Sequence, residues 1–350
     1  MHPGEILQEK LIENGMSRKE LAIRTNVSEK HICTIVNGEK GISAAFAKKL
    51  GYVFENASYW MNLQAEYDIE QARIQEEHNI SQEEINILKP LREILTYCIS
   101  CGYIHNECSD AMKVIQLRDF LLISDLTLIP RITYNAAYRA QLASNVKVDP
   151  YVLFAWQRLC EKRTENIQVK NAVDKELLSQ NINNIKLMMF DDIDKGIEKL
   201  QRIFAECGIA FQVVQNFRGA PVQGFIKETS AGKMILCLTI RGKRADRFWF
   251  TLFHEIAHIL YGDYKTRFVD FDTVSGKIEE RADAYAANAL IPPEDYHKFV
   301  LSSNCTQWQN IEAFAEAVNV KPFIVLGRMQ NDEYLDWSDY VDKMVRYDWA

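Results

Sequence analysis

The chain has 350 residues, with 41 Lys and Arg against 48 Asp and Glu, and a formal net charge of −7. Hydrophobic residues make up 47% and charged residues 25% of it, as in ordinary globular proteins. This length predicts two or three domains, and the charge argues against a large surface coated by nucleic acid. No apolar run approaches the roughly 20 residues of a membrane span, and a signal-peptide pattern is missing. We therefore expect a cytoplasmic protein without membrane contact and with reduced cysteines.

The first 70 residues predict a small domain of five helices. Ser17, with Glu20 three positions later, has the pattern of a capping box, and Ser28 is a second predicted N-cap. The two short helices that they begin are joined by a three-residue turn, as in a helix-turn-helix. Leu50 and Trp60 lie on further helical segments. Hydrophobic spacing places the first three helices at 3–14, 18–24 and 29–36.

In a helix-turn-helix, the start of the second helix of the motif enters the major groove of double-stranded DNA. The Ser28 hydroxyl is a candidate phosphate contact, and four residues that follow it are candidates for base contacts. Residues 1–70 hold eight Lys and Arg against ten Asp and Glu, a net charge of −2. Few cations are therefore available for phosphate contacts, and a protein-binding role for this fold remains the alternative. The candidate DNA-binding residues are Ser28, Glu29, Lys30, His31 and Thr34.

This region resembles the Cro/C1-type helix-turn-helix, and within it the HigA/VapI antitoxin-like branch. The resemblance rests on the opening His2-Pro3-Gly4-Glu5-Ile6-Leu7 and on later matches at Leu21-Ala22, Val27-Ser28, Ile32 and Ile35-Val36-Asn37-Gly38. It implies an operator DNA as ligand and a cognate toxin as partner, and a homodimer is a further expectation. Two weak half-site readers would then add up on a palindromic site.

The middle of the chain, residues 71–185, predicts a helical connector with helices near 91–100, 109–122 and 135–143. Within it, Cys98, Cys101, His105 and Cys108 place four soft ligands in eleven residues. Such a group is able to bind a structural zinc ion. Because cysteine near a helix end is often a small buried hydrophobe, both interpretations stay open.

The third region, residues 186–350, begins with a predicted helix at 194–207, followed by three strand-like runs at 209–215, 222–227 and 234–240. A turn at Ala231-Gly232 joins the last two runs. The edge strand of such a sheet is able to pair with an extended substrate backbone. Gly224 would permit a close approach at that edge. Arg241, Arg244 and Arg247 are more often surface charges, although one of them is able to stabilise an oxyanion. Other candidate oxyanion donors, among which the sequence does not choose, are Tyr261, Tyr285 and His297.

The most informative motif is His254-Glu255-Ile256-Ala257-His258, which follows an almost wholly apolar segment. On a helix, positions i and i+4 share one face, so both imidazoles are able to bind one metal ion. Glu255 lies beside them as a candidate general base. Gly262 is the expected C-cap. The apolar surroundings predict a buried helix, in which electrostatic effects are strong.

A second predicted helix, 277–290, is rich in alanine and ends before Pro292-Pro293. Glu279 and Asp283 are four positions apart and share a face, whereas Glu280 is rotated by about 100°. Glu279 is the candidate third metal ligand, and Asp283 would accept a hydrogen bond from a ligand histidine. The alternative is a solvated, charged helix start.

These residues resemble the ImmA/IrrE family of zinc metallopeptidases, over roughly residues 190–350. The matching groups are the His-Glu-x-x-His motif, Glu279-x-x-Ala282-Asp283-x-Tyr285-Ala286 and Leu290-Ile291-Pro292. The resemblance implies Zn²⁺, with His254, His258 and Glu279 as ligands and Glu255 as the catalytic base. It also implies cleavage of a helix-turn-helix repressor or antitoxin. Arg281 departs from the Glu or Gln that the family often has there.

Together these observations predict a mainly α protein with a small β-sheet, of the α+β class. Residues 1–70 form a five-helix DNA-binding domain, 71–185 a helical connector and 186–350 a gluzincin-like metallopeptidase domain. The predicted function is a transcriptional regulator or antitoxin-like protein with a zinc-dependent endopeptidase. The alternative is a non-proteolytic antitoxin or transcription factor whose peptidase-like domain senses a ligand or binds a partner. A regulator with a purely structural zinc ion is a third hypothesis.

Overall fold

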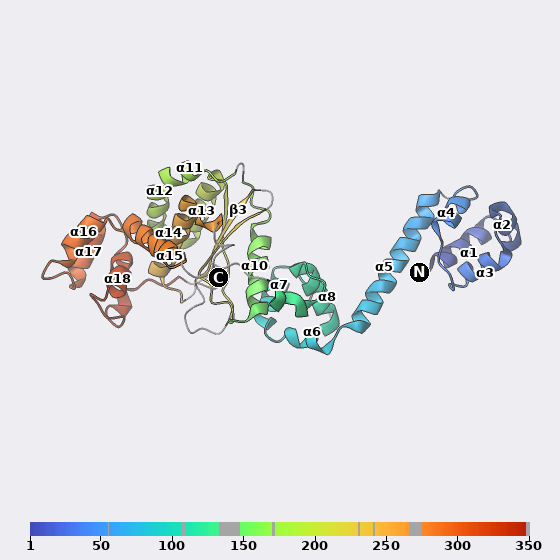
Figure 1. Cartoon of the computed structure of the whole chain (residues 1–350), viewed down its shortest axis with the longest axis horizontal. Helices are drawn as coiled ribbons and strands as arrows, with labels where there is room; N and C mark the ends of the chain where they lie inside the picture. Colours follow the sequence, from blue (N-terminus) through green and yellow to red (C-terminus); the bar gives the residue numbers. More distant parts are fainter. Residues whose placement is uncertain are drawn as a thin grey trace. The chain divides into compact units, whose positions relative to one another are not determined.

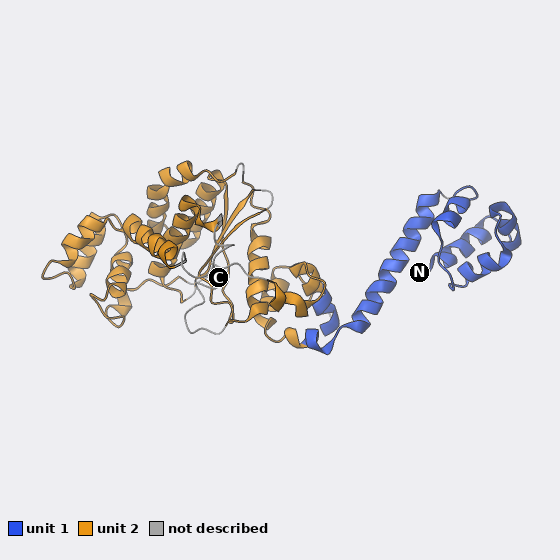
Figure 2. Ribbon diagram, in the orientation of Figure 1, with its two compact units in different colours: residues 1–85, 108–115 blue, residues 86–107, 116–350 orange. Residues whose placement is uncertain are grey.

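The structure is a computed structural model that describes residues 1–54, 56–106, 109–132, 148–169, 172–229, 232–240, 242–265 and 275–347. It divides into two compact units, one of residues 1–85 with 108–115 and one of residues 86–107 with 116–350 (Figure 2). The helix expected at 135–143, Arg241 and Cys108 lie outside the described residues. The proposed boundaries at 70 and 185 stay predictions.

The first unit contains the five expected helices (Figure 1). A buried core holds them together, with Leu7, Leu21, Ile35 and Trp60 among its fully buried side chains. The helices are α1 (Pro3–Glu13), α2 (Arg18–Thr25), α3 (Glu29–Val36), α4 (Ala44–Leu50) and α5 (Ala57–Asn79).

The opening of α1 is a capping box that the sequence analysis did not recognise. His2 Nδ1 accepts a hydrogen bond from the Gly4 amide, and the Glu5 carboxylate accepts one from the His2 amide. Gly4 permits α1 to approach α3, since a Cβ there would lie 1.9 Å from the carbonyl oxygen of Ile35. At α2, Ser17 accepts from the Glu20 amide as expected. The described contacts of the Glu20 carboxylate are with Arg24. The second bond of the expected capping box, from the Ser17 amide to Glu20, is therefore replaced by an i,i+4 ion pair.

Several helices follow. Those at Arg92–Ser100, Asp110–Leu121 and Ile193–Glu206 lie close to predicted helices, whereas the three helices between residues 150 and 187 were not predicted. The chain forms α6 (Gln82–Ile87), α7 (Arg92–Ser100), α8 (Asp110–Leu121) and the 3-10 helix η1 (Leu126–Arg131). Next come α10 (Pro150–Thr164), α11 (Lys175–Gln180), α12 (Ile182–Leu187), η2 (Met188–Phe190) and α13 (Ile193–Glu206).

A three-stranded mixed sheet lies in the second unit, formed by β1 (Ile209–Val213), β2 (Gly224–Glu228) and β3 (Met234–Leu238). The strand order is β1-β3-β2, with β3 parallel to β1 and antiparallel to β2. All five residues of β3 are buried, because helices cover both of its faces. The three predicted strands are therefore present, each shorter than its apolar run.

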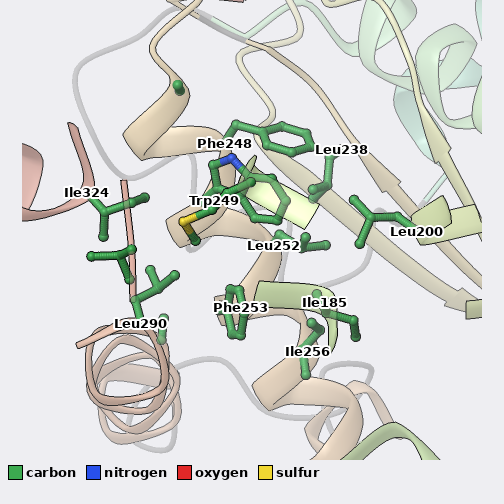
Figure 3. Packing of buried hydrophobic residues seen from close by; sticks show 14 of the residues in the cluster. Ile185, Leu200, Leu238, Phe248, Trp249, Leu252, Phe253, Ile256, Leu290 and Ile324 are labelled. Atoms are coloured by element: carbon green, nitrogen blue, oxygen red, sulfur yellow. The ribbon is translucent and has the colours of Figure 1, made fainter. Parts of the chain in front are cut away.

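The two faces of the sheet follow the two-residue period of a strand. On one face, Trp156 of α10 contacts Phe225, and Cys237 lies against the carbonyl group of Cys160. The other face joins the large core that includes residues of α13 and α14 (Ala245–Tyr261). Figure 3 shows Leu238 of β3 and Leu200 of α13 among the apolar side chains around α14. The sheet is thus a support for α14.

The remaining elements are helical and complete the core around α14. They are η3 (Asp263–Lys265), α15 (Ser275–Leu290), α16 (Pro293–Val300), α17 (Trp308–Ala317), α18 (Pro322–Asn331) and η4 (Val341–Lys343). The expected fold class, mainly α with a small sheet, is confirmed. Among the described helices, none has the length and apolar character that a bilayer crossing requires.

Candidate metal centre

Helix α14 is buried along nearly its whole length, from Ala245 to Ile259. Gly262 ends it in the left-handed conformation, with φ of 80°, as expected for a C-cap glycine. Helix α15 packs directly on α14. Ala282 and Ala286 are fully buried in that interface, and their small side chains let the two helix backbones approach closely. The approach brings one face of α15 to the histidines of α14.

The structure brings together ligand atoms of His254, His258 and Glu279 within 4.8 Å of one another. The two Nε2 atoms lie 2.9 Å apart, and Glu279 Oε2 lies 3.1 Å from Nε2 of His254 and 3.6 Å from Nε2 of His258. Tetrahedral zinc with bonds of about 2.0–2.1 Å separates its ligand atoms by about 3.3 Å. The three observed separations bracket that value. The donor set of two imidazoles and one carboxylate therefore fits a zinc ion with one position left open.

His254 is held in place by Asp283, whose Oδ1 lies 2.7 Å from His254 Nδ1. An Nδ1–H that donates to this carboxylate leaves Nε2 as the ligand atom. Burial lowers the pKa of His254, but the hydrogen bonds with Asp283 and Glu279 and the charge of Glu255 outweigh it and raise the pKa to about 10. The carboxylates thus favour positive charge at this point, which is the electrostatic environment that a divalent cation requires.

On the other side of the site, Asp263 and Arg281 form a support that the sequence analysis missed. Asp263 Oδ2 lies 3.6 Å from Nδ1 of the buried His258. Arg281 donates to both oxygens of Asp263, at 2.7 and 2.9 Å, and its guanidinium lies 4.2 Å from the centre of the Tyr261 ring. Arg281, which departs from the family pattern, is therefore the partner of a buried carboxylate beside a candidate ligand. The sequence feature that could have indicated this support is the acidic Asp263, which directly follows the C-cap Gly262.

Glu255 is fully buried, on the same helix and one position after the first histidine. Gly224, the first residue of β2, lies against it, since a Cβ on Gly224 would meet Glu255 Oε1 at 2.2 Å. The close approach anticipated for this glycine is therefore made to the carboxylate of the candidate base. The edge strand β2 and the candidate base are neighbours.

Among the described residues, His254, His258 and Glu279 are the only grouping of metal-binding side chains. Cys98 is buried in α7, and burial raises the pKa of its thiol to about 12. The packing of Cys98 favours the hydrophobic interpretation of the Cys98, Cys101, His105 and Cys108 group, of which Cys108 lies outside the described residues.

In the first unit, Ser28, Glu29 and Lys30 are exposed at the start of α3. The Ser28 hydroxyl accepts from the His31 amide as an N-cap. His31 and Thr34 are half-buried. The His31 ring contacts Phe46 edge to face, with the centroids 5.1 Å apart, and the Thr34 hydroxyl donates to the carbonyl group of His31. Burial, with the charges of Lys40 and Lys49, lowers the pKa of His31.

These features define a class of protein, a helix-turn-helix unit followed by a unit with a two-helix His, His and Glu centre. Comparison with known families gives both parts a name. Residues 217–329 match the peptidase family described as the IrrE N-terminal-like domain. The N-terminal region is 37% identical over 93 residues to virulence-associated protein I of Dichelobacter nodosus. This match covers 26% of this chain and 81% of that protein.

The chain therefore belongs, in its N-terminal region, to the HigA/VapI-like family of helix-turn-helix antitoxins, and it carries an IrrE N-terminal-like domain. It is also 38% identical over 72 residues to virulence-associated protein A' of the same organism, of which it spans 63%. A solved structure titled Pseudomonas aeruginosa antitoxin HigA with higBA promoter is 41% identical. The match covers 23% of this chain and 96% of that one, with a TM-score of 0.22.

Proposed function

We propose that this chain is a DNA-binding, antitoxin-like transcriptional regulator with a zinc-dependent endopeptidase that hydrolyses a peptide bond in a repressor or antitoxin. One observation carries the enzymatic part, the convergence of His254, His258 and Glu279 beside the buried Glu255. Buried charges are costly unless they are paired or bind metal. A site of this composition is therefore better explained by metal chemistry than by packing.

In this proposal His254, His258 and Glu279 hold the ion, while Asp283 and Asp263 orient the two imidazoles. A zinc ion bound there supplies Lewis-acid activation of water and of the scissile carbonyl group. Glu255 accepts a proton from the attacking water and donates it to the departing amine. Its burial excludes bulk water and strengthens its interaction with nearby charges.

The substrate backbone would lie along β2. This strand is paired with β3 on one side and ends the described sheet on the other. An extended peptide is able to add to such an edge through main-chain hydrogen bonds. Because Gly224 of β2 lies against Glu255, a peptide on this edge would pass beside the candidate base.

For the first unit we propose that α3 enters the major groove of an operator, with Ser28, Glu29, Lys30, His31 and Thr34 facing the DNA. The exposure of Ser28, Glu29 and Lys30 at the start of α3 supports this placement. A homodimer on a palindromic operator would compensate for the low positive charge of the unit. A cognate toxin is the proposed second partner, and binding of operator DNA would place the protein in the cytoplasm.

The first experiment measures the zinc content of the purified chain, of Glu279→Ala and of the matched control Glu280→Ala. Glu280 is exposed on the next position of the same helix. We expect stoichiometric zinc in the wild type and in the Glu280 variant, and loss of zinc in the Glu279 variant. Absence of zinc from all three proteins would overturn the enzymatic proposal.

The second experiment incubates the zinc-loaded chain and Glu255→Gln with candidate helix-turn-helix repressors and antitoxins. Cleavage by the wild type and its loss in Glu255→Gln, by about 10²–10⁴-fold, is the expected result, with zinc retained in both proteins. Equal cleavage by the two proteins would exclude Glu255 as the base. Zinc binding with no cleavage of any candidate would favour the non-proteolytic regulator.

A further inference from the structure

The start of α14 is held by a segment that is distant in sequence. A helix leaves its first amides without intrahelical partners, and a side-chain cap normally satisfies one of them. Among the described residues, Arg244 at the N-cap of α14 makes no side-chain capping bond. Instead, the Ala245 amide donates to the Val345 carbonyl group at 3.0 Å. The segment after α18 therefore supplies the cap that the helix lacks.

Residues 344–347 form a strap that pairs with the residues preceding α14. Arg346 and Arg244 form an antiparallel bridge, and the Tyr347 amide donates to the Lys243 carbonyl group at 2.8 Å. The strap is thus a short extended segment that is added through main-chain hydrogen bonds, a mode by which proteins also hold separate peptides.

The Tyr347 side chain anchors the strap in the core. Its hydroxyl accepts a hydrogen bond from Trp249 Nε1 at 2.8 Å, and its ring contacts Phe248 edge to face, with the centroids 5.8 Å apart. Phe248 and Trp249 are buried in the apolar cluster around α14 (Figure 3). Because the same helix carries His254 and His258, the strap is attached to the element that positions both candidate ligands.

A turn that precedes the strap is tied to the same end of α14. The buried Gln330 of α18 donates to the carbonyl groups of Asp336 and Asp339, at 3.2 and 3.0 Å. Its Oε1 accepts from Arg244 at 2.7 Å, and the Arg244 guanidinium lies 4.9 Å from the centre of the Trp337 ring. The segment after α18 is therefore held at two points, both of them at the start of α14.

The backbone near these contacts is strained. Lys243, Glu333 and Tyr340 have φ of 60°, 62° and 53°, in the left-handed region that disfavours residues with a Cβ. Such conformations persist only where the surrounding contacts impose them, and they are common in switch regions. Release of the strap would relieve part of this strain, which reduces the free energy that release requires.

From these contacts we infer that the strap is a releasable latch that fixes the position of α14 and thereby regulates the metal centre. When the latch is engaged, Ala245 is capped, Trp249 is held, and the helix presents His254 and His258 at zinc spacing. When it is released, the start of α14 loses both partners and the helix is free to shift. Small displacements of such groups have large effects on function. The regulatory part of this inference rests on the proposed zinc peptidase.

The latch lies outside the matched family domain, which ends at residue 329. A latch that favours zinc binding must itself be stabilised by zinc, by the same factor, because coupling between two sites is reciprocal. A segment that only completes the fold has no such dependence on zinc. The effect of zinc on the strap therefore distinguishes the two roles.

The test measures hydrogen exchange of the strap and of the first turn of α14 in the full chain, with and without zinc. Tyr347→Phe leaves the buried indole N–H of Trp249 without this acceptor, so we expect exchange to become about tenfold faster. Saturating zinc should slow the same exchange in the wild type by about tenfold. Truncation after Lys343, which removes the strap, should weaken zinc binding by an equal factor in competition with a chelator.

Tyr340→Phe is the matched control. Its hydroxyl donates to the Thr306 carbonyl group at 2.9 Å and so removes a similar bond from the same segment without touching α14. We expect the exchange of α14 and the zinc affinity of this variant to equal those of the wild type. If the truncated chain fails to fold, the effect of zinc on strap exchange in the full chain decides the question.

The outcomes separate this inference from the proposed function. Unchanged exchange of α14 in Tyr347→Phe would overturn the latch. Strap exchange that does not respond to zinc, in a chain that binds zinc, would overturn the link to the metal centre. A chain that takes up no zinc would contradict the peptidase proposal, while faster exchange in its Tyr347→Phe variant would still support the hold of the strap on α14.

Discussion

The helix-turn-helix unit exposes three of its five candidate DNA contacts, whereas the metal centre buries both of its histidines and the candidate base. Glu29 and Lys30 are exposed at the start of α3, while His258 and Glu255 have no solvent exposure. An exposed charge costs the fold almost nothing, so its presence says little about its role. A buried charge is costly unless it is paired or bound to metal. The buried charges of the metal centre are therefore stronger evidence of function than the exposed charges of α3. Four predictions test this contrast.

The largest effect is expected at the contact between Gly224 and Glu255. A Cβ at position 224 would lie 2.2 Å from Glu255 Oε1, the movable end of a side chain, so Gly224→Ala should displace the carboxylate and leave the fold intact. We expect cleavage to fall by about 10²-fold, because displacements near 1 Å have that effect. Zinc content and thermal unfolding should not change. Gly276→Ala, where a Cβ meets no atom within 4 Å, is the control. Unchanged cleavage in Gly224→Ala would contradict a role for Glu255.

In the first unit, substitution of Gly4 is expected to lower the stability of the fold instead of changing the position of a catalytic side chain. In Gly4→Ala the new Cβ would lie 1.9 Å from the Ile35 carbonyl oxygen, and a backbone atom has no easy escape. Helix α1 or α3 must shift, at a cost of about 1–3 kcal/mol of stability. Hydrogen exchange should show faster opening of α1 to α5 and unchanged protection of α14. Loss of protection in α14 as well would show that the two units unfold as one.

The support behind His258 is expected to have a smaller effect. Arg281→Gln leaves the buried Asp263 without its guanidinium partner, 3.6 Å from His258. Loss of partners behind a ligand typically weakens metal binding by about 10–100-fold, and we expect the lower end because Asp263 itself remains. Competition with a chelator measures the affinity. Lys277→Gln, an exposed cation on the same helix, controls for the change in charge. Equal zinc affinity in wild type and Arg281→Gln would make Arg281 a purely surface residue.

The smallest effect is expected on the exposed face of α3. Lys30→Ala should weaken binding to DNA from the chain's own promoter a few-fold and reduce the salt dependence by about one phosphate contact. Lys10→Ala on α1, where Lys10 pairs with Glu13, is the control. Fluorescence anisotropy at several salt concentrations measures both quantities. If both variants bind DNA like the wild type, the exposed start of α3 does not contact DNA, and protein contact becomes the better hypothesis.

Local patterns predicted much of this architecture. Apolar spacing and cap residues located α1 to α3 because helix boundaries depend on side chains within a few positions. The His-x-x-x-His spacing and the alanines of α15 indicated a metal centre because a helix fixes which residues share a face. The sequence missed the His2 capping box, since histidine is an unusual cap, and it assigned Glu20 a backbone contact where an arginine competes.

By itself, then, the sequence determined α1 to α3, α7, α8, α13 to α15, the three strands and the face of α14 that carries two imidazoles, because these follow from backbone periodicity. Only the tertiary structure decided which distant groups meet. The Asp263–Arg281 pair, the contact of Gly224 with Glu255 and the contact of Tyr347 with Trp249 each join segments whose separation in the chain carries no local pattern. Such contacts arise when whole elements pack to bury apolar area, and the polar groups brought together by that packing must then satisfy one another.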